Sequence, residues 1–193
     1  MDDMLLPAIQ ARYACRRFLP DPLALEDVAS ILEAGRLAPS GFGLEPWRFV
    51  VVGDADRARV AEACFDQQPA ATAAGLIVIV ALVAQLDPQS DYVRARFDAE
   101  ARGAANEPVY DAYRAVYRSD SIAAWAIGQC NFAVAHMLLQ AAHLGLASCP
   151  IGGFDSTLLA RTLHLPDGEV PALVLAFGHC AHAAPERLRK PLA

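Results

Sequence analysis

Apolar residues along this chain follow two patterns, stripes with helical spacing and short continuous runs. The runs at 47–53, 76–83 and 172–178 are typical of strands. The run at 76–83 is rich in Ile and Val without interruption, so we expect that strand to be buried on both faces. The stripes predict helices over 3–14, 24–37, 55–64, 90–117, 122–144 and 156–163. Helices alternating with strands indicate an α+β or α/β arrangement, with the helices packed on the sheet.

Four residues are expected to delimit these helices. Asp54 and Asp155 each precede a helical stripe and are suited to cap it, because a carboxylate accepts hydrogen bonds from the free N–H groups of the first turn. Pro39 and Gly145 are expected to end the helices before them. The chain has no internal repeat or linker, so residues 1–193 are interpreted as a single domain.

The segment 122–146 resembles a membrane span in length, at roughly 35 Å for a helix that rises ~1.5 Å per residue. It also contains side chains that are costly to place in hydrocarbon. These polar residues are Gln129, Asn131, His136, Gln140 and His143. We therefore expect a long central helix of a soluble protein, and its Ala-rich faces suit close packing against other helices.

Composition indicates a folded, soluble protein. The 193 residues are 55% hydrophobic and 20% charged, which allows a sizeable core and suits burial of some surface against a partner subunit. The net charge of −6 argues against nucleic-acid binding. Five cysteines without a CxxC pair predict no disulfide framework and a reducing compartment. Two aspartates stand near the start, where a signal peptide would be basic, so we expect a cytoplasmic protein.

Two basic clusters stand out in this acidic chain, one near each end. Each cluster has an ordinary interpretation, as charge at the end of a helix or as a solubilising tail. Guanidinium groups also bind phosphate through paired hydrogen bonds, so together the clusters suggest an anion site. They comprise Arg12, Arg16 and Arg17, and Arg187, Arg189 and Lys190.

Two glycine-containing loops could approach a flat ring closely. In APSGFGLEPWRF (38–49), Ser40 offers a hydroxyl, while Gly41 and Gly43 permit unusual backbone angles. In CPIGGFD (149–155), the adjacent Gly152 and Gly153 could turn their N–H groups toward a ring nitrogen. Either loop could equally be a plain connection between elements.

Other chemistries have weaker support. The chain has no GxGxxG or Walker sequence, so a Rossmann or P-loop nucleotide site is not indicated. His179 and His182 flank Cys180 with no standard zinc spacing and with too few ligands, so no metal site is predicted. Cys149 could be a nucleophile if a histidine folded beside it, but its apolar flanks favour an inert, partly buried thiol.

The three stretches RYACRRF (12–18), APSGFGLEPWRF and CPIGGFD together resemble the nitroreductase family in content, order and spacing. The resemblance covers essentially the whole chain. It implies an α+β, three-layer fold with a central, mainly antiparallel sheet flanked by helices, and an intertwined homodimer. It also implies FMN at the dimer interface, reduced by NADH or NADPH and reoxidised by a nitroaromatic, a quinone or a related small electrophile.

The resemblance also assigns residues. Arg12 with Arg187 or Arg189 would hold the FMN phosphate, and Arg16 would lie near the flavin N1–O2 edge. Residues of the loop at 38–49 would come from the partner subunit. No side chain is assigned as catalytic, because the flavin carries the chemistry. The full set expected to bind the cofactor is Arg12, Tyr13, Ala14, Arg16, Pro39, Ser40, Gly41, Gly43, Asp66, Gln67, Pro150, Ile151, Gly152, Gly153, Arg187 and Arg189.

The chain departs from the family pattern at several of these positions. Ala14 replaces a serine, Gly43 an asparagine, Asp66 an asparagine and Gly152 a frequent glutamate. These changes bear on FMN affinity and substrate more than on the fold. Alternative functions are a semialdehyde reductase, a flavin-fragmenting or dehalogenating enzyme of the same fold, or a flavin-binding protein without turnover.

Overall fold

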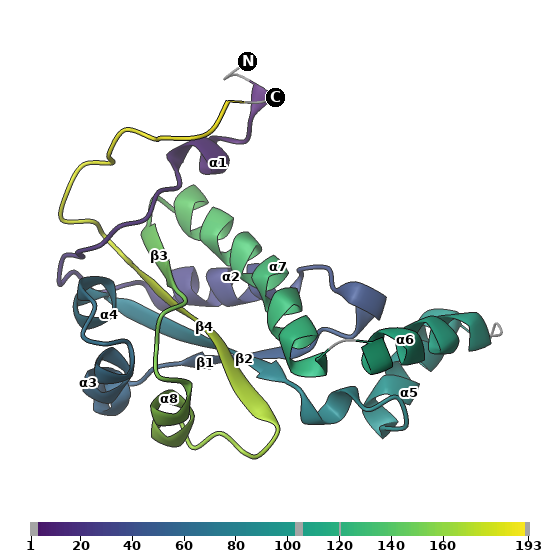
Figure 1. Ribbon diagram of the computed structural model, residues 1–193. Helices are drawn as coiled ribbons and strands as arrows, with labels where there is room; N and C mark the ends of the chain where they lie inside the picture. Colours follow the sequence, from purple (N-terminus) through teal and green to yellow (C-terminus); the bar gives the residue numbers. More distant parts are fainter. Residues whose placement is uncertain (1–3, 103–105, 120, 192–193) are drawn as a thin grey trace.

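Four strands form one antiparallel sheet in the order β1-β2-β4-β3 in a computed structural model that describes residues 4–102, 106–119 and 121–191 (Figure 1). Each neighbouring pair is antiparallel, so the expected α+β fold with an antiparallel sheet is confirmed. The strands are β1 (Trp47–Val51), β2 (Gly75–Leu82), β3 (Ala147–Ile151) and β4 (Glu169–Gly178).

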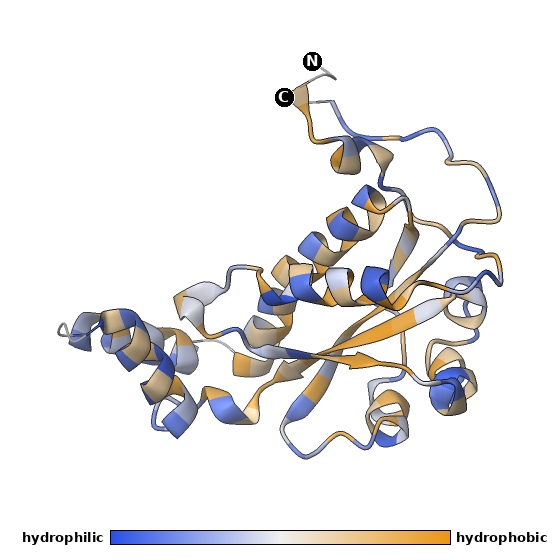
Figure 2. Ribbon diagram, turned by 180° about the vertical axis from the view of Figure 1, so that it is seen from behind, coloured by the Kyte–Doolittle hydropathy of each residue, from blue (hydrophilic) through white to orange (hydrophobic). Residues whose placement is uncertain are grey.

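The inner strand β2 is buried on both faces, as its apolar run predicts. Side chains alternate along a strand, so odd and even positions enter different cores. Ile77, Ile79 and Ala81 belong to one apolar cluster. Leu76, Val78 and Val80 belong to the other. The sheet therefore separates two hydrophobic cores, and Figure 2 shows its strands as predominantly apolar.

Helices cover both faces of the sheet and make three layers (Figure 1). One layer contains α2 (Leu25–Arg36) and α7 (Ile122–His143), which pack on each other and on the first cluster. The other contains α3 (Asp54–Ala63), α4 (Gln68–Thr72) and α8 (Ser156–Thr162). Among the described residues, α7 is the one helix long and apolar enough to cross a membrane by length and composition. Its contacts with the sheet make it a core helix, as expected.

The stretch predicted as one helix at 90–117 contains two, α5 (Asp91–Ala101) and α6 (Glu107–Ser119), which project from one end of the molecule (Figure 1). The first helix ends because Arg102 takes a left-handed backbone, with φ 47°. Aromatic rings join the pair to the body, with Phe42 packed edge-on against Tyr113 at 5.3 Å.

The N-terminal helix is shorter than the predicted 3–14. Within the described residues, α1 spans Pro7–Ala11, and Arg12 already has extended backbone angles of −65° and 126°. The following segment, residues 12–18, is called the arm below. The arm lies along the outer edge of β3, where Ala14 forms a parallel bridge with Ser148. Arg12, Arg16 and Arg17 therefore lie outside the helix.

The predicted helix ends are partly confirmed. The Asp155 carboxylate accepts a hydrogen bond from the Leu158 N–H at 2.9 Å and caps α8. Asp54 is not a cap, because it lies inside the first turn of α3 after Gly53. Gly145 follows the end of α7 with φ +76°, which favours glycine.

Replacing Asp155 by Ala is expected to lower the free energy of unfolding by about 1 kcal/mol, because the α8 N–H group loses its acceptor. The neighbouring change Ser156→Ala, at an exposed position inside the same first turn, should stay within about 0.5 kcal/mol of the unchanged protein. Urea unfolding followed by circular dichroism measures both. Equal losses in the two variants would show that Asp155 does not act as the cap.

Candidate functional site

The arm is fixed between the end of β4 and the edge of β3. The Cys15 N–H donates to the Ser148 carbonyl at 3.0 Å, and the N–H of Leu19, just beyond the arm, donates to the His179 carbonyl at 2.8 Å. Along the arm, Arg12 and Tyr13 line one hollow, and Arg16 and Arg17 line another; both hollows are described below.

The two basic clusters meet at the start of the arm. The Arg187 guanidinium donates to the carbonyl oxygens of Ile9 at 3.1 Å, Gln10 at 2.7 Å and Arg12 at 2.6 Å. It thereby fastens the C-terminal tail to the end of α1. Burial, together with the nearby charges of Arg187 and Arg189, lowers the pKa of the Arg12 guanidinium.

This arrangement is unfavourable without an anion. Like charges that stand close and partly buried repel, and a bound phosphate or carboxylate removes that repulsion. Within the part of the chain that the structure describes, no ion pair involves Arg12, Arg187 or Arg189. The cluster therefore has the charge and the hydrogen-bond donors of an anion site.

A hollow of about 510 Å³ lies beside the arm, next to the turn that follows β3. Its volume is in the range of small-molecule sites. Four of its lining residues, Arg16, Gln67, Pro150 and Ile151, are among those expected to bind a cofactor. The other lining residues include Arg17, which belongs to the first basic cluster, and Gln68, Pro69 and His182, which were not predicted to bind a cofactor. They reach the hollow through contacts between segments far apart in sequence.

Gln67 links the two sides of this hollow. Its side-chain amide donates to the Gly153 carbonyl at 2.7 Å and to the Cys64 carbonyl at 2.9 Å. A Cβ added to Gly152 would meet nothing within 4 Å, and one added to Gly153 would meet only the Gln67 amide, at 3.7 Å. The turn therefore presents an open surface that a flat ring could approach.

Asp66 lies at the end of α3, immediately before Gln67. Its side chain is exposed and its φ is 50°, next to Phe65 with φ 57°. Two consecutive left-handed residues are unusual outside glycine. The structure thus places Asp66 next to a residue of the hollow, although Asp66 does not itself line it.

Cys149 has a buried thiol in the wall of the hollow. Burial raises the pKa of this thiol, and the charges of Arg16 and Arg12 offset only part of that rise. The thiol is therefore protonated near neutral pH. This agrees with the inert role expected for it, since a nucleophilic cysteine needs a lowered pKa.

The loop with Pro39, Ser40, Gly41 and Gly43 lies far from the arm in the same chain. The Gly41 N–H donates to the side chain of Gln129 at 2.7 Å, near the start of α7. Ala142 lines a hollow beside the arm. It follows Gln129 by 13 residues in the same helix, a distance of roughly 20 Å. These loop residues can therefore join the site only if a second chain supplies them.

The two loop glycines also have structural roles. Gly43 has φ +61°, and a Cβ there would collide with the Glu100 carboxylate. A Cβ on Gly41 would lie 2.9 Å from the Trp125 ring. Their presence therefore does not by itself indicate ligand binding.

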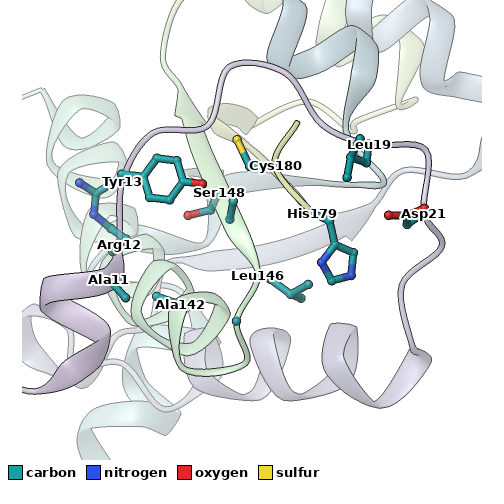
Figure 3. A pocket seen from close by; sticks show the side chains of 12 residues that line it. Ala11, Arg12, Tyr13, Leu19, Asp21, Ala142, Leu146, Ser148, His179 and Cys180 are labelled. Atoms are coloured by element: carbon teal, nitrogen blue, oxygen red, sulfur yellow. The ribbon is translucent and has the colours of Figure 1, made fainter. Parts of the chain in front are cut away.

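A second hollow, of about 470 Å³, lies on the other side of the arm (Figure 3). Figure 3 shows the Tyr13 ring reaching toward β3, while the Arg12 guanidinium points away from the other lining side chains. Ser148 and Cys180 line the same hollow. The Ser148 hydroxyl is buried without a hydrogen-bond partner among the described residues.

Cys15 and Cys180 form a disulfide, with their Cα atoms 5.9 Å apart. The cysteine count and spacing did not predict this bond. The partners are 165 residues apart in sequence, and the arm reaches the end of β4 through the bridge between Phe18 and Cys180 and the hydrogen bond from the Ala181 N–H to the Arg17 carbonyl at 2.9 Å. Cys64, Cys130 and Cys149 are free and buried.

Comparison with known proteins agrees with this geometry. The family model described as "Nitroreductase family" matches residues 9–179. A Staphylococcus saprophyticus protein, provisionally named an NAD(P)H nitroreductase, is 31% identical over 207 residues, covering 98% of this chain and 94% of its own. A Thermus thermophilus protein named NADH dehydrogenase is 33% identical over 199 residues, covering 97% and 95%.

Solved structures show the same fold. A nitroreductase-like protein from Streptococcus mutans has a TM-score of 0.81 at 22% identity, covering 99% of this chain and 96% of its own. A provisionally named nitroreductase from Exiguobacterium sibiricum, solved in complex with FMN, has a TM-score of 0.77 at 23% identity, covering 95% and 91%. The sheet and its helical layers thus have the fold of these nitroreductase structures. The chain belongs to the nitroreductase family.

Inorganic phosphate should stabilise the flavin-free protein, because it neutralises the arginine cluster. For a Kd of about 1 mM, 10 mM phosphate adds about 1.4 kcal/mol. This corresponds to a rise of roughly 3–6 °C in Tm for a domain of this size. Differential scanning fluorimetry against chloride of equal ionic strength measures the rise.

The rise should disappear in Arg12→Gln and persist in Arg59→Gln, which removes an exposed arginine of α3. The same rise in both variants would place phosphate binding elsewhere on the molecule.

Proposed function

We propose that this protein is an FMN-dependent NAD(P)H oxidoreductase that passes electrons in a ping-pong cycle to nitroaromatics, quinones or related small electrophiles. The observation that carries the proposal is the cluster of Arg12, Arg187 and Arg189 at one end of the arm, beside the hollow lined by Arg16 and the 150–151 backbone. The NAD(P)H and FMN in the names of its relatives support the same assignment.

The donor set of this region fits FMN. A phosphate needs cations and hydrogen-bond donors, which Arg12, Arg187 and Arg189 would supply. Ala14 has no hydroxyl to offer, so the phosphate would depend on guanidinium groups alone. The open surface beside Gly152 and Gly153 suits the ring. Tyr13 and Ala14 would contact the cofactor mainly through the backbone of the arm.

The bound flavin would supply the capacity to accept a hydride and release electrons. The chain would supply position and charge. Arg16, in the wall of the hollow, would place a cation against the pyrimidine edge, which favours negative charge at that edge. The Gln67 amide would hold the 152–153 turn in place through the Gly153 carbonyl.

We further propose a homodimer with FMN at its interface. Only 28% of the most apolar stretch of α7 is buried within one chain. Its exposed side carries the large apolar Phe132 and the small residues Ala124, Gly128 and Ala135, which allow a second helix to approach closely. A partner would also bring the loop with Ser40 and Gly41 to the site. We propose a cytoplasmic location, where NAD(P)H is available.

The purified protein should be yellow, and anaerobic NADH or NADPH should bleach its visible absorbance. Adding a quinone or a nitroaromatic should restore the colour. A protein that binds FMN but is not bleached by either donor would be a flavin-binding protein without this turnover. A colourless protein that does not take up added FMN would contradict the proposal.

Arg16→Ala should lower the midpoint potential of the bound flavin by roughly 30–60 mV, the equivalent of about 1.5–3 kcal/mol of lost charge stabilisation. Arg16→Lys should retain part of the effect, since the charge survives. Spectroelectrochemical titration measures the potential. If Arg16→Ala abolishes FMN binding at an unchanged potential, Arg16 is a phosphate ligand instead.

Ala135→Glu should prevent dimerisation, because it places a charge on the exposed face of α7 without disturbing the fold of one chain. The control Ala55→Glu adds the same charge on the outer side of α3 and should remain dimeric. Analytical ultracentrifugation distinguishes the two. A dimeric Ala135→Glu protein would show that α7 is not at the interface.

A further inference from the structure

The disulfide between Cys15 and Cys180 joins the middle of the arm to the segment that follows β4. The neighbouring residue His179 accepts the hydrogen bond from the Leu19 N–H through its carbonyl. Cys15 stands three residues after Arg12 and one before Arg16. The bond is thus the covalent attachment of the segment that carries both arginines assigned to the flavin.

The remaining attachments of the arm are few. The Cys15 N–H binds the Ser148 carbonyl at 3.0 Å, and the Phe18 N–H binds the Thr72 hydroxyl at 3.0 Å. Arg187 adds its bond to the Arg12 carbonyl, but this bond is solvent-exposed. The Ala181 N–H also donates to the Arg17 carbonyl at 2.9 Å, and Cys15 and Phe18 are buried in the second apolar cluster. Without the disulfide, the arm is an edge segment held by these few contacts, and such segments open locally at low free energy.

One sulfur of the disulfide is accessible. Cys15 is buried, with 1% of its surface exposed, whereas Cys180 is partly exposed and lines the hollow of Figure 3. This hollow is therefore the route by which a small thiol would approach the disulfide from the Cys180 side. The Arg17 carbonyl oxygen lies 3.1 Å from the Cys15 sulfur and 3.7 Å from the Cys180 sulfur. It can accept a hydrogen bond from either thiol once the disulfide is reduced.

We propose that the Cys15–Cys180 disulfide is a reversible redox clasp that orders the arm and so controls how tightly the protein retains FMN. The control of FMN rests on the proposed function. Small thiols would open the clasp, and small disulfides would close it.

The clasp opens in two thiol–disulfide exchange steps. A thiolate attacks the Cys180 sulfur, the Cys15–Cys180 bond breaks, and Cys15 leaves as a thiolate that takes a proton. A second thiolate attacks the mixed disulfide and releases Cys180, which also takes a proton. The cystine gains two electrons and two protons, and two small thiols are oxidised to one small disulfide. Closure is the same exchange in reverse.

The test compares the oxidised protein, the protein reduced with a phosphine, and Cys180→Ser. Hydrogen exchange by mass spectrometry follows peptides that cover 12–19, and FMN fluorescence quenching gives the Kd. Cys64→Ala, which removes a buried cysteine outside the disulfide, is the matched control. Reduction and Cys180→Ser should each speed exchange in the arm and weaken FMN binding by roughly tenfold. Cys64→Ala should behave as the unchanged protein in both redox states.

The outcomes separate the two proposals. Unchanged exchange in the arm after reduction, or five free thiols by alkylation of the air-oxidised protein, would overturn the clasp whatever FMN does. Faster exchange with an unchanged Kd would overturn its control of FMN. If exchange becomes faster but neither the oxidised nor the reduced protein binds FMN, the flavin proposal is refuted. The proposed control of FMN binding is refuted with it, while the ordering of the arm by the disulfide remains established.

Discussion

The attachment of the arm to the edge of β3, through the hydrogen bond from the Cys15 N–H to the Ser148 carbonyl, sets the arrangement of the site. It holds the arm along the outer edge of β3, where α1 has already ended at Ala11. The arm then passes the turn that follows β3, so Arg16 lies beside Pro150. If α1 had continued through Arg12, the arginines would follow a helical surface instead.

The second constraint is charge. Arg187 binds three carbonyl oxygens at the end of α1, and this brings the C-terminal tail to Arg12. Gathering cations in this way is costly in a protein without a ligand: burial lowers the pKa of Arg12, and the charges of Arg187 and Arg189 lower it further. Electrostatic repulsion stored at one place is typical of a functional site, because a bound anion removes it. The fold thus gathers these cations where the segments near its two ends meet, which supports the proposed anion site (Figure 1).

The pattern of apolar residues predicted the helices and strands whose formation depends mainly on residues nearby in sequence. The apolar run of β2 and the long stripe of α7 were identified because burial there requires nearly every position to be apolar. β3 was missed, since Pro150 and the following glycines favoured a turn. The extended arm and the disulfide depend on contacts between residues 15 and 148 or 180, which no periodicity records. Of the residues that line the hollow, Arg16, Gln67, Pro150 and Ile151 were predicted from the resemblance to the family. Their spacing along the chain could not have shown that they lie together.

The central claim is that the arginine cluster at the start of the arm recognises the phosphate of a flavin nucleotide. Equilibrium binding of FMN and of riboflavin, which lacks the phosphate, tests it most directly. The two ligands share the ring and the ribityl chain, so their difference isolates the phosphate. We expect FMN to bind ~10- to 100-fold more tightly than riboflavin, which is the gain in affinity from one charge-assisted hydrogen bond to the phosphate. Equal affinities for FMN and riboflavin would contradict the account.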